Sequence, residues 1–296
     1  MYFNNSNNYF HGIMFHHFHD GQNHKRSQGS ISKDDFVKLI KFINRDNILD
    51  ADIFFEKCKS NTLKANELCF TFDDGIKSQI DVALPILEDF KIKSFFFVPT
   101  SMFTGKPDNL EIFRHFRTNY FKSINEFYKS FFKTLDYDLS DFLNKQKEKI
   151  KEKKNRLPLY SYDDIKFRLV RDIFLGKEKY ENIMLEMIKK KNINLKDFYP
   201  LLLFNKQDLK NLDSLGHMIG LHSHFHPTSM AKLSYKEQEN EYSTNLNTLS
   251  EILEKPKNQI KHMSHPCGDY NNDTLKILKT LGIELGFKQH MFTDDK

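Results

Sequence analysis

Tryptophan is absent from this chain of 296 residues, and cysteine, proline and glycine are sparse, at 3, 8 and 11 residues. The cysteines are odd in number and form no CxxC pair, which argues against a disulfide scaffold and fits a reducing compartment. The most apolar runs, at 94–99 and 201–204, are far too short to span a bilayer. The residues from Met1 to Asn8 have neither the basic nor the apolar region of a signal peptide. We therefore expect a cytoplasmic protein without a membrane span.

A large excess of one charge is also missing, because 45 lysines and arginines nearly balance 40 aspartates and glutamates and leave a formal net charge of +5. This bias falls well short of the basic stripe expected of a nucleic-acid-binding protein. The lysine-rich runs at 145–154 and 189–191 alternate with apolar residues at helical spacing, which is typical of solvated helix faces. We therefore expect no nucleic-acid partner. The 29 Phe and 12 Tyr indicate a globular chain rather than a disordered one.

Short apolar runs alternate with amphipathic segments along most of the chain. This order is typical of a parallel α/β sheet or barrel, in which the loops after the strands carry the chemistry. Residues 102–204 differ, since their apolar residues recur at three and four, and we interpret them as a mostly helical insertion with helices at 162–174 and 177–191. The expected strands are 12–15, 67–72, 93–98, 218–221 and 259–264, and the expected helices are 32–44, 79–90 (with a kink or a late start at Pro85), 205–215, 234–254 and 272–281.

Two clusters that follow expected strands combine carboxylates and imidazoles. Asp73 and Asp74 precede Gly75, a pattern that by itself is typical of an ordinary turn. His222 and His226 are four residues apart, so on a helical turn both imidazoles would lie on one face and reach one ion. Two such histidines and a carboxylate form a facial set for a divalent metal with open coordination positions. One aspartate would bind the metal and the other would act as a general base, which predicts a hydrolase.

A third cluster, residues 264–271, follows another expected strand. Pro266 and Gly268 would fix a turn whose backbone N–H groups can serve as an oxyanion hole. Between them, Cys267 is interpreted as a small buried apolar residue rather than a nucleophile.

The motifs Phe70–Gly75, His222-Ser223-x-x-His226-Pro227 and Pro266-x-Gly268, in this order, resemble the polysaccharide deacetylase superfamily (NodB-homology, carbohydrate esterase family 4). The resemblance implies an α/β fold, a distorted (β/α) barrel of the NodB-homology type with a large helical insertion. Residues 1–296 would then be a single catalytic domain, interrupted by the insertion at about 102–204.

This resemblance also implies an activity, the metal-dependent removal of the N-acetyl group from an amino sugar or glycan precursor, in surface polysaccharide metabolism. It makes Asp73 the base, and it makes Asp74, His222 and His226 the ligands of one divalent ion, most often Zn²⁺. The amide N–H of Cys267, together with the ion, would polarise the acetyl carbonyl. The partner expected is an N-acetylated sugar or oligosaccharide, and the sequence predicts no oligomeric state.

The general acid is expected by resemblance to a branch that acts on poly-N-acetylglucosamine, in which a histidine after the first strand is thought to have this role. His16 occupies that place here, with His17 and His19 as alternatives, and a loop role for all three is the other interpretation. No late Leu-x-His motif, the usual source of the acid, is found.

The third motif departs from the family pattern in two ways. Many members have an arginine near its start, where this chain has Ser264 and His265, and an aromatic residue usually stands at the position of Cys267. Two alternative functions stay open, and these departures support the second of them. One is hydrolysis of another C–N bond in a small metabolite, and the other is a catalytically silent carbohydrate-binding relative.

Overall fold

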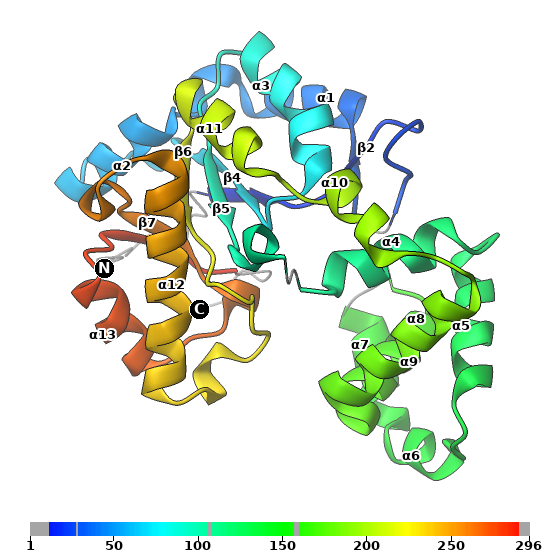
Figure 1. The fold of residues 1–296 in the computed structure, drawn as a ribbon. Coiled ribbons are helices and arrows are strands. Elements are labelled where there is room, and N and C mark those ends of the chain that lie inside the picture. The colour runs from blue at the N-terminus through cyan, green and yellow to red at the C-terminus, as the bar shows by residue number, and fades with distance from the viewer. Residues whose placement is uncertain (1–11, 28, 106–107, 157–159, 290–296) are drawn as a thin grey trace. The chain divides into compact units, whose positions relative to one another are not determined.

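A computed structural model describes residues 12–27, 29–105, 108–156 and 160–289, and it divides the chain into two compact units (Figure 1). The sheet unit comprises Met1–Asp108 and Tyr199–Lys296, and the helical unit comprises Asn109–Phe198. The helical unit lies within the span expected for the insertion. That the chain acts as a single catalytic domain stays a prediction. The segment Met1–Asn8, used in the signal-peptide prediction, lies outside the described residues.

The sheet unit contains a six-stranded parallel sheet with the order β1-β4-β5-β6-β7-β8. Its strands are β1 (Gly12–Phe15), β4 (Cys69–Asp73), β5 (Phe95–Val98), β6 (Met218–Leu221), β7 (His262–Ser264) and β8 (Leu285–Phe287). This topology confirms the expected α/β barrel-type fold. The start of β7 was predicted wrongly, because residues 257–259 form a 3₁₀ turn before the strand. A smaller sheet pairs β2 (Phe18–His19) with β3 (Ile31–Ser32).

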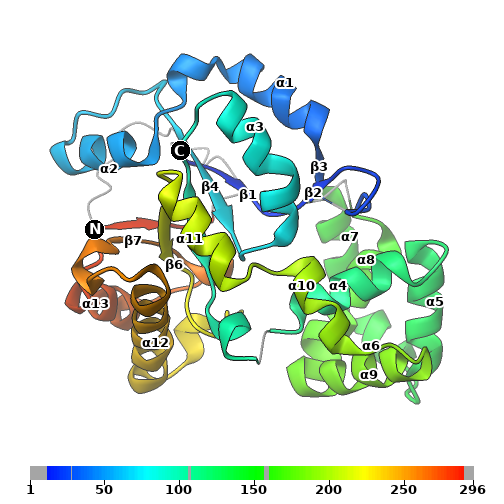
Figure 2. The same cartoon turned by 45° about the horizontal axis from the view of Figure 1, so that its top comes forward.

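The central strands are apolar on both faces, as parallel strands covered by helices require. Every residue of β4 and β5 is buried, and the stacked rings of Phe72 and Phe96 lie 4.7 Å apart between these strands. Pro85 is in the first turn of α3 (Leu84–Asp89), directly after a π-helical segment at Gln79–Ala83, so the α-helix starts late, which is one of the two expected outcomes. The helix α12 (Tyr235–Leu253) packs beside α11 (Lys206–Ser214) and α13 (Asn272–Thr280) (Figure 2). The helices of this unit are α1 (Lys33–Ile43), α2 (Ala51–Ser60), α3 (Leu84–Asp89), α10 (Tyr199–Leu202), α11 (Lys206–Ser214), α12 (Tyr235–Leu253) and α13 (Asn272–Thr280).

The helical unit has an aromatic core of its own, which includes the buried rings of Phe127, Phe131 and Phe167. The buried carboxylate of Asp164 accepts hydrogen bonds from the Tyr128 hydroxyl and from Arg168, each at 2.7 Å. The helix expected at 162–174 is α-helical as far as Leu169 and continues as a π-helical segment at Val170–Leu175, and the helix expected at 177–191 is present. The helices are α4 (Leu110–Asn119), α5 (Ile124–Thr134), α6 (Ser140–Lys145), α7 (Lys147–Arg156), α8 (Tyr162–Leu169) and α9 (Gly176–Lys190).

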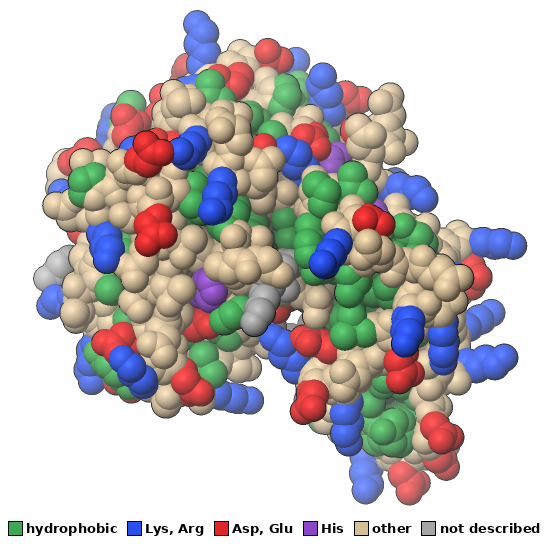
Figure 3. Space-filling model, viewed as in Figure 1, with side chains coloured by type: hydrophobic (Ala, Val, Ile, Leu, Met, Phe, Trp, Pro, Cys, Tyr) green, Lys and Arg blue, Asp and Glu red, His purple; other side chains and the backbone are tan. Residues whose placement is uncertain are grey.

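Acidic and basic side chains are interspersed over the face shown in Figure 3, in keeping with the small net charge of +5. Among the described residues, no helix combines the length and the apolar character needed to cross a membrane.

Candidate active site

The three sequence clusters meet at the carboxyl edge of the main sheet. The register pairs Phe15 of β1 with Phe72 of β4, so His16 follows its strand beside Asp73. The next pairs are Val98 with Leu221 and Leu221 with Met263, which place the residues after β6 beside the end of β7. The parallel pairing of the strands therefore brings these loops together at one edge of the sheet, and their role as one active site stays a prediction.

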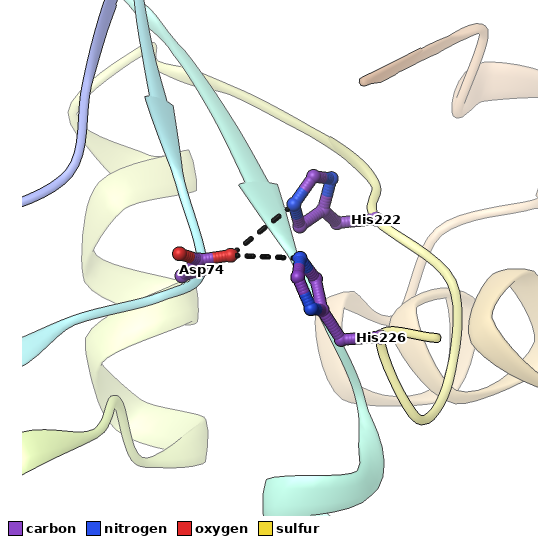
Figure 4. Close-up of side chains that lie close together, drawn as sticks. All are labelled: Asp74, His222 and His226. Carbon is purple, nitrogen blue, oxygen red and sulfur yellow. Dashed lines mark ion pairs between the residues drawn. The ribbon is translucent and has the colours of Figure 1, made fainter. Parts of the chain in front are cut away.

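Asp74, His222 and His226 form a compact group of possible metal ligands (Figure 4). The Nε2 atoms of His222 and His226 lie 3.2 and 3.3 Å from the same oxygen, Oδ1 of Asp74. The two rings have centroids 4.8 Å apart. Among the described residues, this is the one group found in which three such side chains bring a ligand atom each within 4.8 Å of the others.

The loop from His222 to His226 differs from the helical turn that we expected. The backbone is left-handed at Ser223 (φ 61°) and His226 (φ 52°), and residues 222–226 are not helical. Side chains satisfy the backbone donors that a helix would have paired. Glu241 accepts hydrogen bonds from the N–H groups of residues 224 and 225 at 2.9 and 2.7 Å, and the Ser223 hydroxyl accepts one from His226 N–H at 3.1 Å. The loop conformation, rather than helical periodicity, brings the two imidazoles together.

His222 is held at both its backbone and its ring. Its backbone N–H donates to Oδ1 of Asn245 at 2.9 Å, and its Nδ1 lies 2.9 Å from the carbonyl oxygen of Ser264. A carbonyl oxygen can only accept, so Nδ1 carries the proton and Nε2 presents a lone pair toward Asp74. A metal-binding histidine ordinarily has its second nitrogen held in this way.

Asp74 reaches this point because the chain turns sharply after β4. Its φ of 76° is in the left-handed region, and its N–H donates to the carbonyl of Phe97 at 3.1 Å. Gly75 follows with a φ of 62°, where a Cβ would lie 3.0 Å from Cγ1 of Val98. Only glycine fits this second position without strain.

The electrostatics of the ligand group favour a positive charge between the three side chains. Burial alone would raise the pKa of Asp74, yet His226, His16 and His222 hold its pKa well below the usual value. Burial lowers the pKa of His222, but Asp73 and Asp74 outweigh it, and the pKa is raised overall. For His226, burial dominates over the nearby Asp74 carboxylate, and its pKa is lowered.

These residues fit a divalent cation. Oδ1 of Asp74 is buried, and no hydrogen bond from the described residues reaches it, although two ring nitrogens lie close. With neutral rings, a carboxylate oxygen and nitrogen lone pairs would face one another, and a cation between them would relieve that repulsion. Two imidazoles and one carboxylate are ligands that zinc and related divalent ions accept.

Asp73 is buried next to this group. Its Oδ2 accepts a hydrogen bond from the Ser264 hydroxyl at 2.8 Å and lies 4.0 Å from Nε2 of His222. Its Oδ1 is buried without a hydrogen-bond partner in the described part of the chain. The Asp73 carbonyl accepts from the Gln79 side-chain amide at 2.6 Å, and the same amide bonds the His16 carbonyl at 3.0 Å. Gln79 therefore ties the ends of β1 and β4 together.

His16 faces the same group from β1. Its Nε2 lies 3.6 Å from Oδ2 of Asp74, and its side chain is 32% exposed. The ring of His17 stacks on that of His16 at a centroid distance of 6.0 Å, while Nδ1 of His19 is bonded to the Ser30 hydroxyl at 2.9 Å. Of the three histidines considered as the acid, His16 is thus shown next to the candidate ligands and open to solvent. Its role as the acid stays a prediction.

The third motif forms a 3₁₀ turn at Pro266–Gly268, with Cys267 in the left-handed region at φ 53°. The expectation that Cys267 is buried was wrong, because its side chain is exposed on this turn. Its backbone N–H as part of an oxyanion hole stays a prediction.

Several residues that support the site gave no signal in the sequence. Gln79, Glu241 and Asn245 are on segments with ordinary helical patterns, and their partners are far along the chain. Ser264 did carry a signal, since it is one of two residues, with His265, at the place where many members of the family that the sequence resembles have an arginine.

Comparison with known proteins identifies the fold and finds a family-model match over part of the chain. A family model described as polysaccharide deacetylase matches residues 175–286. No curated protein sequence matches the chain significantly. The deacetylase PplD of Streptococcus pyogenes, in complex with acetate, has a similar fold, with a TM-score of 0.53, 15% identity and alignment over 94% of this chain and 82% of that one.

Two further solved structures are similar over 94% of this chain. IcaB from Ammonifex degensii gives a TM-score of 0.52 at 14% identity over 82% of its length. A de-N-acetylase from Aggregatibacter actinomycetemcomitans gives a TM-score of 0.52 at 12% identity over 86% of its length. At these identities the likeness shows the fold, a mostly parallel half-barrel surrounded by helices. The family-model match shows that residues 175–286 are similar to polysaccharide deacetylases.

Proposed function

We propose that this protein is a metal-dependent hydrolase that removes the N-acetyl group from an N-acetylated sugar or oligosaccharide. The observation that carries the proposal is that the Nε2 atoms of His222 and His226 face the same buried oxygen, Oδ1 of Asp74. The buried carboxylate of Asp73 lies beside this group. The match of residues 175–286 to the polysaccharide deacetylase model supports the substrate class. Surface polysaccharide metabolism and a cytoplasmic location are parts of the same proposal.

The metal would be held by Asp74, His222 and His226, and we propose Zn²⁺ because the ligands are two imidazoles and one carboxylate. A bound divalent ion supplies Lewis acidity, which lowers the pKa of water and polarises a carbonyl. The Ser264 carbonyl fixes the ring of His222, so that Nε2 is the nitrogen available as a ligand.

The protein's own groups would move the protons. Asp73 would accept a proton from the attacking water through Oδ1, which has no hydrogen-bond partner among the described residues. His16 would donate a proton to the sugar nitrogen as the C–N bond breaks, which leaves acetate and a free amine. The turn at 266–268 would offer a backbone N–H to the carbonyl oxygen.

The test is acetate release from N-acetylglucosamine oligomers by the zinc-loaded protein, compared with its Asp73→Asn variant. We expect acetate release that the variant abolishes, while zinc remains bound because Asp73 is not a ligand. Loss of zinc together with activity would show that the roles of Asp73 and Asp74 are exchanged. A zinc-loaded protein that releases no acetate from any N-acetylated sugar tested would contradict the proposal and favour one of the alternative functions.

A further inference from the structure

Ser264, the last residue of β7, bonds two different side chains of the site. Its hydroxyl donates to Oδ2 of Asp73 at 2.8 Å, and its carbonyl oxygen lies 2.9 Å from Nδ1 of His222. Ser264 and Asp73 are buried, with 3% and 2% of their surfaces exposed. Because burial excludes water, a water molecule cannot readily replace either contact, and the loss of either one is costly.

We infer that Ser264 is the positioning residue for the Asp73 carboxylate: its hydroxyl holds Oδ2 and leaves Oδ1 as the proton-accepting atom. This inference rests on the proposed function, in which Asp73 is the base. A carboxylate is free to rotate about its terminal torsion unless one oxygen is held. A short hydrogen bond to an ionised oxygen is among the stronger contacts available for that purpose.

Ser264 and His265 stand near the start of the third motif, where many members of the family that the sequence resembles have an arginine. A serine supplies direction without charge, so the carboxylate is oriented but not paired with a cation. The neighbouring His265 does not restore a charge, because its ring stacks on Tyr270 with centroids 4.3 Å apart and burial lowers its pKa to about 4. Orientation by a neutral donor therefore distinguishes this site from one with an arginine at the same place.

The two contacts of Ser264 can be separated, because only one of them uses the side chain. Ser264→Ala removes the hydroxyl and keeps the carbonyl that holds His222. We expect kcat on N-acetylglucosamine oligomers to fall about 10- to 100-fold, as for other residues that orient a catalytic group. Zinc content and KM should stay within about twofold of the wild type, since neither depends on the direction of the Asp73 carboxylate. Ser264→Thr keeps a hydroxyl and should recover most of the lost rate.

Ser223→Ala is the matched control, because Ser223 is another buried serine of the site whose hydroxyl instead accepts from His226 N–H at 3.1 Å. Its loss should weaken zinc binding, an effect that Ser264→Ala should not share.

A measurement without substrate tests the contact itself. The urea concentration at the midpoint of unfolding is measured for the metal-free wild type, for Ser264→Ala, for Asp73→Asn and for the double variant. Since the two side chains are in direct contact, we expect the double variant to shift the midpoint by an amount clearly different from the sum of the single shifts.

Additive midpoint shifts, or a wild-type kcat in Ser264→Ala, would overturn the inference. An inactive wild-type protein would instead count against the proposed function, and the urea comparison would still decide whether Ser264 is coupled to Asp73.

Discussion

At the scale of single residues, the site depends on carboxylates in places where a lone charge would be costly. Asp73 and Asp74 are adjacent in sequence but have different surroundings: Oδ2 of Asp73 is held by Ser264, whereas Oδ1 of Asp74 faces two imidazoles. Burying an ionised carboxylate is unfavourable unless it is paired or binds a cation. These different contacts support the proposed roles of Asp73 as the base and Asp74 as a metal ligand.

The residues of this group were predictable from sequence, but their contacts were not. Spacing identified His222 and His226 as a pair, yet the helical turn expected between them is a loop with left-handed backbone at His226. Periodicity has meaning only within a regular element, and here a carboxylate 17 residues away sets the loop. The bond between Ser264 and Asp73 joins residues 191 positions apart, which no local pattern reports.

The position of His16 leads to a direct prediction about the general acid. Its Nε2 lies 3.6 Å from Asp74 and its side chain is partly exposed, as a group that delivers a proton to substrate requires. His16→Ala should lower kcat about 100-fold or more, the usual contribution of a general acid, with zinc content unchanged. Steady-state rates and elemental analysis check both parts. His19→Ala is the control, since His19 is bonded to Ser30, and it should retain most of the activity. Equal rates for His16→Ala and the wild type would remove His16 as the acid.

At the scale of elements, α12 holds the loop that carries the candidate ligands. Glu241 and Asn245 are four apart and therefore share a face of this helix. Asn245 accepts from His222 N–H, and its amide donates to the Val98 carbonyl at 3.0 Å and to Thr100 Oγ1 at 3.1 Å. One buried amide thus connects α12, the end of β5 and the loop after β6.

Helix boundaries were predicted well because the capping residues are local. Ser32 and Ser234 accept hydrogen bonds from backbone N–H groups three residues later, as expected at helix starts. The contacts that α12 makes with the site depend on the packing of the whole sheet unit, which a helical pattern does not specify.

The contacts of α12 predict that Asn245→Asp weakens metal binding. The substitution keeps an acceptor for His222 N–H, but it places a carboxylate oxygen where an amide donated to the Val98 carbonyl. We expect zinc affinity to fall about 10- to 100-fold, as for other residues that orient a ligand. Competition with a chelating dye measures the affinity. Asn247→Asp is the matched control, because Asn247 is exposed on the same helix and should bind zinc like the wild type. Equal affinities for the two variants would contradict this role of α12.

At the scale of the whole molecule, the sheet unit buries several histidines in neutral form. Burial lowers the pKa of His217 and His265 to about 4 and that of His262 to about 3. The ring of His262 is enclosed by Phe55 and Phe95, with centroids 5.9 and 5.3 Å away. These groups are protonated more readily in the unfolded chain than in the folded one.

This difference fixes the sign of the pH dependence of stability. Between the ordinary histidine pKa of 6.5 and a folded value of about 3 to 4, the unfolded chain binds more protons. The free energy of unfolding should therefore be highest above pH 6.5 and fall steadily as the pH is lowered toward 4. Urea midpoints from pH 7.5 to 4.5 test this, and His262→Leu should flatten the slope. A midpoint that is constant or rises on acidification would show that these histidines are not buried as described.

The most direct test of the central claim, a divalent metal site, is elemental analysis of the purified protein beside His222→Ala. The variant removes one of the two imidazoles that face Asp74 Oδ1. We predict about one divalent ion per chain in the wild type, most of it zinc, and little or none in the variant. A wild-type protein that holds no metal even after zinc or cobalt is added back would contradict the account, and a catalytically silent carbohydrate-binding protein would then explain the fold better.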